Sequence, residues 1–252
     1  LKLGGGDDVI TAFNTESIDG GAGDDTFMLV DKATRIIDGG AGNDTLDVSL
    51  SSEEVGQTIV LQDDKLEKTE DGVLGVVNVE NVKGSDYNDT FTGNASANNL
   101  FGGAGDDTLS GGGGDDLLSG GTGNNAAVYT GPMANYRFGA SAVGLVVADA
   151  VGADGSDTLV DIETLSFADG SIQVSIVDGK YTLSGSALSD SITIDGDVGL
   201  ALAGGDGNDT LTGGAGGDIL SGDAANDILR GQAGADQLRG GAGDDTLYAD
   251  SA

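Results

Sequence analysis

The chain has 252 residues, with 43 acidic and ten basic side chains, no histidine, no cysteine and a formal net charge of −33. This charge disfavours nucleic acid and anionic lipid as partners, because both attract basic patches. The missing histidine and cysteine exclude Ser–His and Cys–His nucleophiles and the usual zinc and copper sites. No apolar stretch reaches the ~18 residues of a membrane-spanning helix. We therefore expect no nucleic-acid partner, no membrane insertion and no enzymatic activity.

A nine-residue unit, G-G-x-G-x-D-x-U-x with U a large apolar residue, starts near the N-terminus and recurs along the chain. The first block, residues 1–47, holds copies at 3–11, 20–28 and 39–47, whose sixth-position aspartates lie 17 and 19 residues apart. These spacings are close to two units, so one edge of this block keeps good turns while the other has lost them. Each unit divides into a glycine-rich turn and a short strand that points its eighth residue inward.

Residues 48–83 separate the first block from the second and contain no recognisable ligand constellation. Their alternation of apolar and polar residues predicts a β-rich spacer that continues the roll without ion-binding turns. The stretch "EDGVL" at 70–74 carries a D-G hairpin signal, so an excursion from the roll is equally compatible. Its acidic residues, Glu80 among them, are expected to be surface side chains without a partner.

The second block is residues 84–128, with consecutive units at 84–92, 93–101, 102–110, 111–119 and 120–128. Residues 129–184 interrupt the repeat again. The stretches "FADGS" and "VDGKY" predict hairpin turns, and bulky residues such as Tyr129, Tyr136 and Phe167 gather there. We expect a small antiparallel sheet that caps or splices two rolls, with a ligand-binding platform as the alternative. Residues 185–252 form the third block, with units at 185–193, 204–212, 213–221, 222–230, 231–239 and 240–248.

The sixth position of the unit is aspartate in twelve of fourteen copies and asparagine in the other two. Glycine lets main-chain carbonyls turn inward, and the closing carboxylate adds oxygen, so each turn offers the all-oxygen ligands that Ca²⁺ prefers. The alternative is a metal-free solenoid whose aspartates only cap turns. The predicted metal ligands are Asp8, Asp25, Asp44, Asp89, Asn98, Asp107, Asp116, Asn125, Asp190, Asp209, Asp218, Asp227, Asp236 and Asp245 and, from an isolated loop-like stretch at 152–160, Asp157.

This repeat resembles that of the RTX (repeats-in-toxin) family of haemolysin-type calcium-binding proteins, in residues 3–47, 84–128 and 185–248. The resemblance implies an all-β fold, with parallel β-roll blocks and a small antiparallel β insertion. It also implies that turns two units apart stack and share an ion, giving about nine Ca²⁺ ions in all. The implied pairs are Asp8–Asp25, Asp25–Asp44, Asp89–Asp107, Asp107–Asn125, Asn98–Asp116, Asp190–Asp209, Asp209–Asp227, Asp218–Asp236 and Asp227–Asp245. Asn98 and Asn125 should weaken their sites.

Stacked carboxylates make folding without metal unfavourable. Two charges about 5 Å apart repel by roughly 1 kcal/mol in water and by about 3 kcal/mol at an effective dielectric near 20. Several such rows approach the net stability of a whole domain, about 5–15 kcal/mol. We therefore expect the roll to fold only when calcium is bound.

The expected function is that of a secreted calcium-binding protein with a structural or adhesive role, located outside the cell or at the cell surface. The RTX resemblance implies type I-like export, followed by folding on calcium outside the cell. Expected partners are calcium ions and either cell-surface components or further copies, stacked end to end into a fibre or surface layer. The alternative is a non-catalytic C-terminal tail of a secreted enzyme such as a lipase, protease or alginate epimerase. Because the chain starts and ends within repeats and lacks an initiator Met, we expect a piece of a longer polypeptide.

Overall fold

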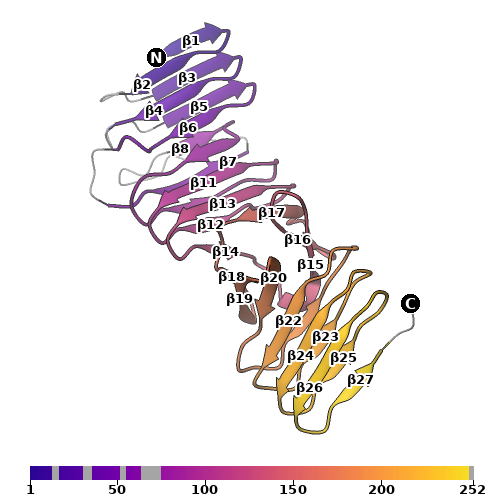
Figure 1. Ribbon diagram of the computed structural model, residues 1–252. Helices are drawn as coiled ribbons and strands as arrows, with labels where there is room; N and C mark the ends of the chain where they lie inside the picture. Colours follow the sequence, from indigo (N-terminus) through magenta and orange to yellow (C-terminus); the bar gives the residue numbers. More distant parts are fainter. Residues whose placement is uncertain (13–16, 31–35, 52–54, 64–74, 250–252) are drawn as a thin grey trace. The chain divides into compact units, whose positions relative to one another are not determined.

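The computed structural model describes residues 1–12, 17–30, 36–51, 55–63 and 75–249. The chain falls into two compact units, Leu1–Ala126 and Ala127–Ala252, which are described separately below (Figure 1). The one helical element among the described residues is a single 3₁₀ turn, η1 (Met133–Asn135), and the rest of the regular structure is strand. No helix in those parts is long and apolar enough to cross a membrane. The predicted all-β fold is confirmed.

Unit 1 is a parallel β-roll in which the chain alternates between two faces. One face has the strand order β1 (Lys2–Gly5), β3 (Ser17–Ala22), β5 (Ile36–Ala41), β8 (Gly75–Val77), β7 (Thr58–Gln62), β10 (Thr90–Thr92) and β12 (Thr108–Ser110). The other face has the order β2 (Val9–Ala12), β4 (Thr26–Leu29), β6 (Thr45–Asp47), β9 (Asn81–Lys83), β11 (Asn99–Ala104) and β13 (Leu117–Thr122). Strand β14 (Ala126–Val128) spans the division between the two units.

The core of the roll is a column of eighth-position side chains. Parallel pairing places Phe91 beside Leu109 on one face and Leu100 beside Leu118 on the other, and all four are buried. In the three-residue strands β10 and β12, the side chains on either side of this buried residue point outward, as the two-residue period requires. Each buried residue of this size contributes roughly 1.5–3 kcal/mol, so the thin core depends on the repeat being kept in phase.

The described part of the spacer continues the roll. Strand β7 pairs in parallel with β10, and β9 pairs with both β6 and β11. Ile59 lies in register with Phe91, as a repeat residue would. The "EDGVL" signal at 70–74 lies outside the described residues.

Unit 2 contains a second parallel roll. One face has the order β20 (Lys180–Ser184), β22 (Ala201–Gly205), β24 (Ile219–Ala224) and β26 (Gln237–Ala242). The other has the order β21 (Ser191–Thr193), β23 (Thr210–Thr212), β25 (Ile228–Arg230) and β27 (Thr246–Tyr248).

The antiparallel insertion precedes this roll in unit 2. Its strands are β15 (Tyr136–Ala140), β16 (Leu145–Asp149), β17 (Ser156–Val160), β18 (Thr164–Phe167) and β19 (Gly170–Val177). Antiparallel pairing of β18 with β19 and of β19 with β20 confirms both predicted hairpins. At the second hairpin Asp178 and Gly179 take φ of 52° and 78°, as a two-residue turn of this kind requires.

The aromatic residues of the insertion form its core. Tyr129, Tyr136 and Phe167 lie with ring centroids 5.0–5.4 Å apart and are buried. The Tyr136 hydroxyl donates a hydrogen bond to Asp154, and burial raises the pKa of Tyr136 above its ordinary value. Because these rings face one another inside the protein, they do not form an exposed ligand-binding platform.

In turns that begin with glycine, such as 102–107, this glycine is required because the sixth-position side chain lies against it. A Cβ added at Gly102 would lie 2.7 Å from the carbonyl oxygen of Gly120 and closer still to Oδ2 of Asp107. We therefore expect Gly102→Ala to lower the free energy of unfolding by about 1–3 kcal/mol, a typical overpacking cost. Gly5→Ala is the matched control, since its Cβ would meet nothing nearer than 3.8 Å. Denaturant unfolding of both variants in one buffer measures the difference, and equal midpoints would contradict the explanation.

Candidate metal centre

The glycine-rich turns stack into rows along the edges of the two rolls. Each row joins turns that carry the chain from one face to the other in the same direction. In unit 1, row 1 contains turns 3–8, 20–25, 39–44, 75–80, 93–98 and 111–116, and row 2 contains turns 84–89, 102–107 and 120–125. In unit 2, row 3 contains turns 185–190, 204–209, 222–227 and 240–245, and row 4 contains turns 195–200, 213–218 and 231–236.

Sixth-position residues of successive turns are hydrogen-bonded in every row. The main-chain N–H of one residue donates to the side-chain Oδ1 of its partner one coil further along, at 2.7–3.0 Å. This bond joins all nine predicted pairs: Asp8–Asp25, Asp25–Asp44, Asp89–Asp107, Asp107–Asn125, Asn98–Asp116, Asp190–Asp209, Asp209–Asp227, Asp218–Asp236 and Asp227–Asp245. The fold therefore brings together the residues that the repeat predicts to share ions.

Several of these carboxylates have one oxygen without a partner. Oδ2 is buried and accepts no hydrogen bond from any described residue in five of them: Asp25, Asp44, Asp107, Asp209 and Asp227. Burial of an ionised oxygen without a compensating contact is costly, so each of these turns needs either a proton or a cation at that oxygen. This donor set fits Ca²⁺, which takes carboxylate and carbonyl oxygens.

Burial also shifts the ionisation of these groups. Burial raises the pKa of Asp44, Asp107 and Asp209 to about 6. Hydrogen bonds from the main chain of the preceding coil act in the opposite direction and lower the pKa. Neighbouring carboxylates raise it further, Glu80 in the case of Asp44 and Asp89 in the case of Asp107. A cation placed among them would act in the opposite direction and hold the carboxylates ionised.

Main-chain carbonyls would have to supply most of the ligands. Across the parts of the chain that the structure describes, no three acidic side chains come together as a metal-binding group. Each turn contributes one sixth-position carboxylate, so a shared ion meets two, and Ca²⁺ requires about six to eight oxygens. The glycine content of the turns is consistent with carbonyls filling the remainder.

Glu80 is a member of row 1 that the sequence analysis missed. Its Oε2 accepts the N–H of Asp44 at 2.8 Å, and its carbonyl accepts the N–H of Asn99 at 3.0 Å. The expectation of a surface side chain without a partner is wrong. Nine residues before Gly84 lies Gly75, so 75–83 is a degenerate unit with glutamate in the sixth position. This nine-residue spacing could have identified Glu80 as a sixth-position residue from the sequence alone.

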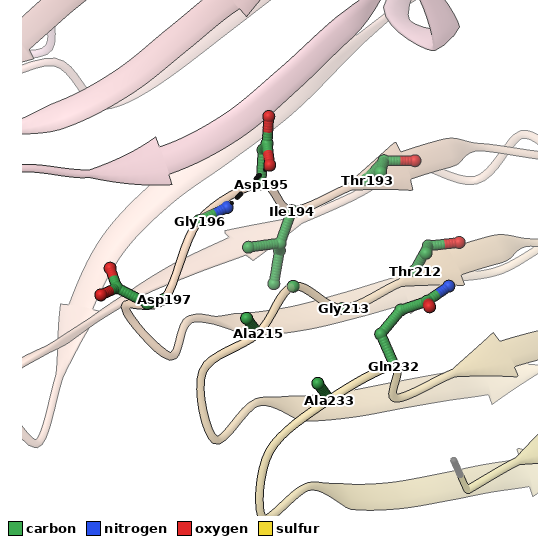
Figure 2. A pocket seen from close by; sticks show the side chains of 11 residues that line it. Thr193, Ile194, Asp195, Gly196, Asp197, Thr212, Gly213, Ala215, Gln232 and Ala233 are labelled. Atoms are coloured by element: carbon green, nitrogen blue, oxygen red, sulfur yellow. Dashed lines mark hydrogen bonds between the residues drawn. The ribbon is translucent and has the colours of Figure 1, made fainter. Parts of the chain in front are cut away.

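Row 4 begins with a turn that lacks a sixth-position acid. Leu200 occupies the place, and its N–H donates to Oδ1 of Asp218 at 2.9 Å. An open hollow of about 650 Å³ lies beside this turn, and in it Asp195 and Asp197 point away from each other (Figure 2). They do not replace the missing carboxylate. Lys180 lies beside this row, and its Nζ donates to the carbonyl of Gly217 at 2.7 Å.

Asp157 lies in a different setting from the other predicted ligands. It is buried near the start of β17, where it pairs with Val147 of the antiparallel strand β16, and not in a glycine-rich turn. The loop that was expected around it is instead organised by Asp149, whose Oδ1 accepts the N–H groups of Val151 and Gly152. A metal-binding role for Asp157 stays a prediction.

Comparison with known proteins identifies the repeat. The profile of the RTX calcium-binding nonapeptide repeat matches residues 17–29, 36–49, 78–109, 92–126, 201–229 and 221–251, together half of the chain. No curated protein sequence matches this chain. The crystal structure of the extracellular lipase LipA from Serratia marcescens is similar at 21% identity, with a TM-score of 0.36, over 87% of this chain and 36% of the lipase. This chain thus spans little more than a third of that enzyme.

Proposed function

The chain belongs to the family of RTX calcium-binding nonapeptide repeats, and from that premise we propose that it is a secreted protein whose two rolls fold by binding calcium in their rows of turns. The observation that carries the proposal is the set of buried Oδ2 atoms without a partner, exemplified by Asp107 and Asp209. They lie at the sixth position, which the repeat supplies for metal binding.

We propose that the ions lie between stacked turns, with the sixth-position residues whose buried Oδ2 lacks a partner, such as Asp107 and Asp209, as their side-chain ligands and Glu80 extending row 1. Free calcium in the cytosol is too low to fill sites with dissociation constants of about 10⁻⁴–10⁻³ M, whereas extracellular calcium can fill them. The chain would therefore remain unfolded until it leaves the cell. No catalytic role is assigned to its residues.

Isothermal titration of the metal-stripped chain tests the metal. We expect several calcium ions to bind at submillimolar to millimolar concentration, and magnesium at the same concentration to bind and fold the chain poorly. The reason is that Mg²⁺ keeps its waters and demands a strict octahedron, which a carbonyl-rich turn does not offer. Lanthanum in place of calcium is a positive control. Equal binding of magnesium, or no binding of either ion, would contradict the proposal.

For the biological role we propose a structural or adhesive module at the cell surface, acting by end-to-end association or by contact with surface components. Analytical ultracentrifugation in millimolar calcium and in chelator tests self-association. The second candidate is a non-catalytic tail of a secreted enzyme. The coding sequence on either side of these residues distinguishes the two, because only the second requires a catalytic domain in the same polypeptide.

A further inference from the structure

Four turns differ from the others in how their sixth-position side chain is satisfied. In turns 84–89, 93–98, 185–190 and 213–218 the N–H of the second residue donates to the sixth residue of the same turn. The bonds run from Ser85 to Asp89 Oδ2 at 2.7 Å, Asn94 to Asn98 Oδ1 at 2.8 Å, Ser186 to Asp190 Oδ2 at 2.6 Å and Gly214 to Asp218 Oδ2 at 2.8 Å. We call these the closed turns.

The backbone at the second position separates closed turns from the rest. None of the four second residues has a positive φ. In every turn whose Oδ2 is buried without a partner, the second residue does have one: Gly21 at 106°, Gly40 at 104°, Gly103 at 113°, Gly205 at 101° and Asp223 at 73°. We call these the open turns, and in them the second N–H does not reach the carboxylate.

The residue type at this position favours one state over the other. Serine rarely takes a positive φ, which glycine adopts without strain, although Gly214 lies in a closed turn and Asp223 in an open one. In two closed turns the serine side chain adds a further bond, since Oγ of Ser85 lies 3.0 Å from Asp89 Oδ1 and Oγ of Ser186 lies 3.1 Å from Asp190 Oδ2. Both hydroxyls also accept an N–H from within the turn, that of Tyr87 or Leu188. These turns satisfy their own carboxylate without a cation.

Closed turns stand at the start of runs of repeats. Turns 84–89 and 93–98 are the first two of the second block, and 185–190 is the first of the third. Turn 213–218 is the first in row 4 to carry a sixth-position acid, after the turn that ends in Leu200. In rows 2 and 3 an open turn, 102–107 or 204–209, directly follows the closed one, whereas in row 1 the open turns 20–25 and 39–44 come before the closed turn 93–98.

We propose that the backbone conformation at the second position of the nonapeptide determines whether a turn takes an ion, so that the closed turns bind none of their own and need no calcium. The ion-binding turns are then the open ones. This inference rests on the proposed calcium-dependent folding and identifies the turns whose calcium ions the folding requires. The amide at Asn98 agrees with it, because a closed turn needs an acceptor oxygen and no charge.

Matched amide substitutions in the full chain test this inference. Asp190→Asn and Asp209→Asn make the same chemical change in neighbouring turns of row 3, one closed and one open. We expect Asp190→Asn to bind as many calcium ions as the unsubstituted chain, with its folding midpoint unchanged. Asp209→Asn should lose at least one ion and raise the midpoint about tenfold or more, as removal of metal-site groups typically does. Asp89→Asn and Asp107→Asn repeat the comparison in row 2.

The outcomes separate this inference from the proposed function. Loss of an ion in Asp190→Asn equal to that in Asp209→Asn would overturn the inference while leaving calcium binding intact, as would a full ion count in both variants. Absence of calcium binding in the unsubstituted chain would instead overturn the proposed function. Ser186→Ala guards against misfolding of the amide variant, because it keeps the closing N–H of residue 186. Its ion count should also be unchanged.

Discussion

Removing calcium from the chain should convert its β-sheet circular dichroism spectrum to that of a disordered coil. In the folded chain Oδ2 is buried without a partner in Asp25, Asp44, Asp107, Asp209 and Asp227. Leaving a buried polar group unsatisfied costs about 1–3 kcal/mol, and more when it is charged. The summed cost of these five groups is comparable to the ~5–15 kcal/mol by which a domain is usually stable, so the rolls should not survive without a cation.

The experiment is a calcium titration of metal-stripped protein at pH 7.5, followed by far-ultraviolet circular dichroism. We expect a cooperative return of the β spectrum at millimolar calcium. Sodium chloride at matched ionic strength is the control, because it screens the net charge of −33 without entering the turns. An intact β spectrum in protein shown by elemental analysis to be free of metal would contradict the expectation.

Acid should partly replace calcium. Burial raises the pKa of Asp44, Asp107 and Asp209 from 3.8 to about 6 in the folded, metal-free chain. A carboxyl whose folded-state pKa is raised binds its proton more tightly in the folded chain than in the unfolded one. Its contribution to stability is therefore fully present below about pH 4 and is lost as the pH rises through about 6. We expect metal-free protein to gain β structure as the pH falls from 7 to 4.5.

With calcium present the pH dependence should reverse. Protons then compete with the ion for the same oxygens, so the calcium concentration at the folding midpoint should rise as the pH falls below about 6. The control is the triple variant Asp44→Asn, Asp107→Asn, Asp209→Asn, whose side chains stay neutral at every pH. It should lose most of the acid-induced gain in the metal-free state, whereas a gain as large as that of the parent chain would assign the effect to net charge instead.

The repeat allowed the rolls and the pairing of their turns to be predicted from sequence, because two positions of opposite polarity keep a fixed phase. The eighth residue fixes register, as Phe91 beside Leu109 shows, and register then places Asp89 one coil from Asp107. The hairpins of the insertion were predictable for a local reason, since Asp178-Gly179 tolerates the positive φ of its turn. Neither inference needed any knowledge of long-range packing.

Other features depend on geometry that the repeat pattern does not encode. Glu80 was missed because a glutamate side chain reaches its partner from a turn that keeps only the first of its glycines, Gly75. Asp157 matched the turn pattern by spacing, yet pairing with Val147 places it in a strand. The distinction between closed and open turns depends on φ at residues such as Ser186 and Gly205, which became visible only in the folded chain.

The hydrogen bonds from the sixth-position N–H groups to side chains of the next coil all run in one direction. The buried N–H of Asp190 is satisfied by Asp209, and that of Asp209 by Asp227, always by the residue that comes later in the chain. The sixth-position N–H groups of one coil thus gain their acceptors only when the next coil has formed. In a roll that assembles from its N-terminal end, the last coil to form would still lack these acceptors. We therefore expect a coil without a successor to be less stable than the coils before it.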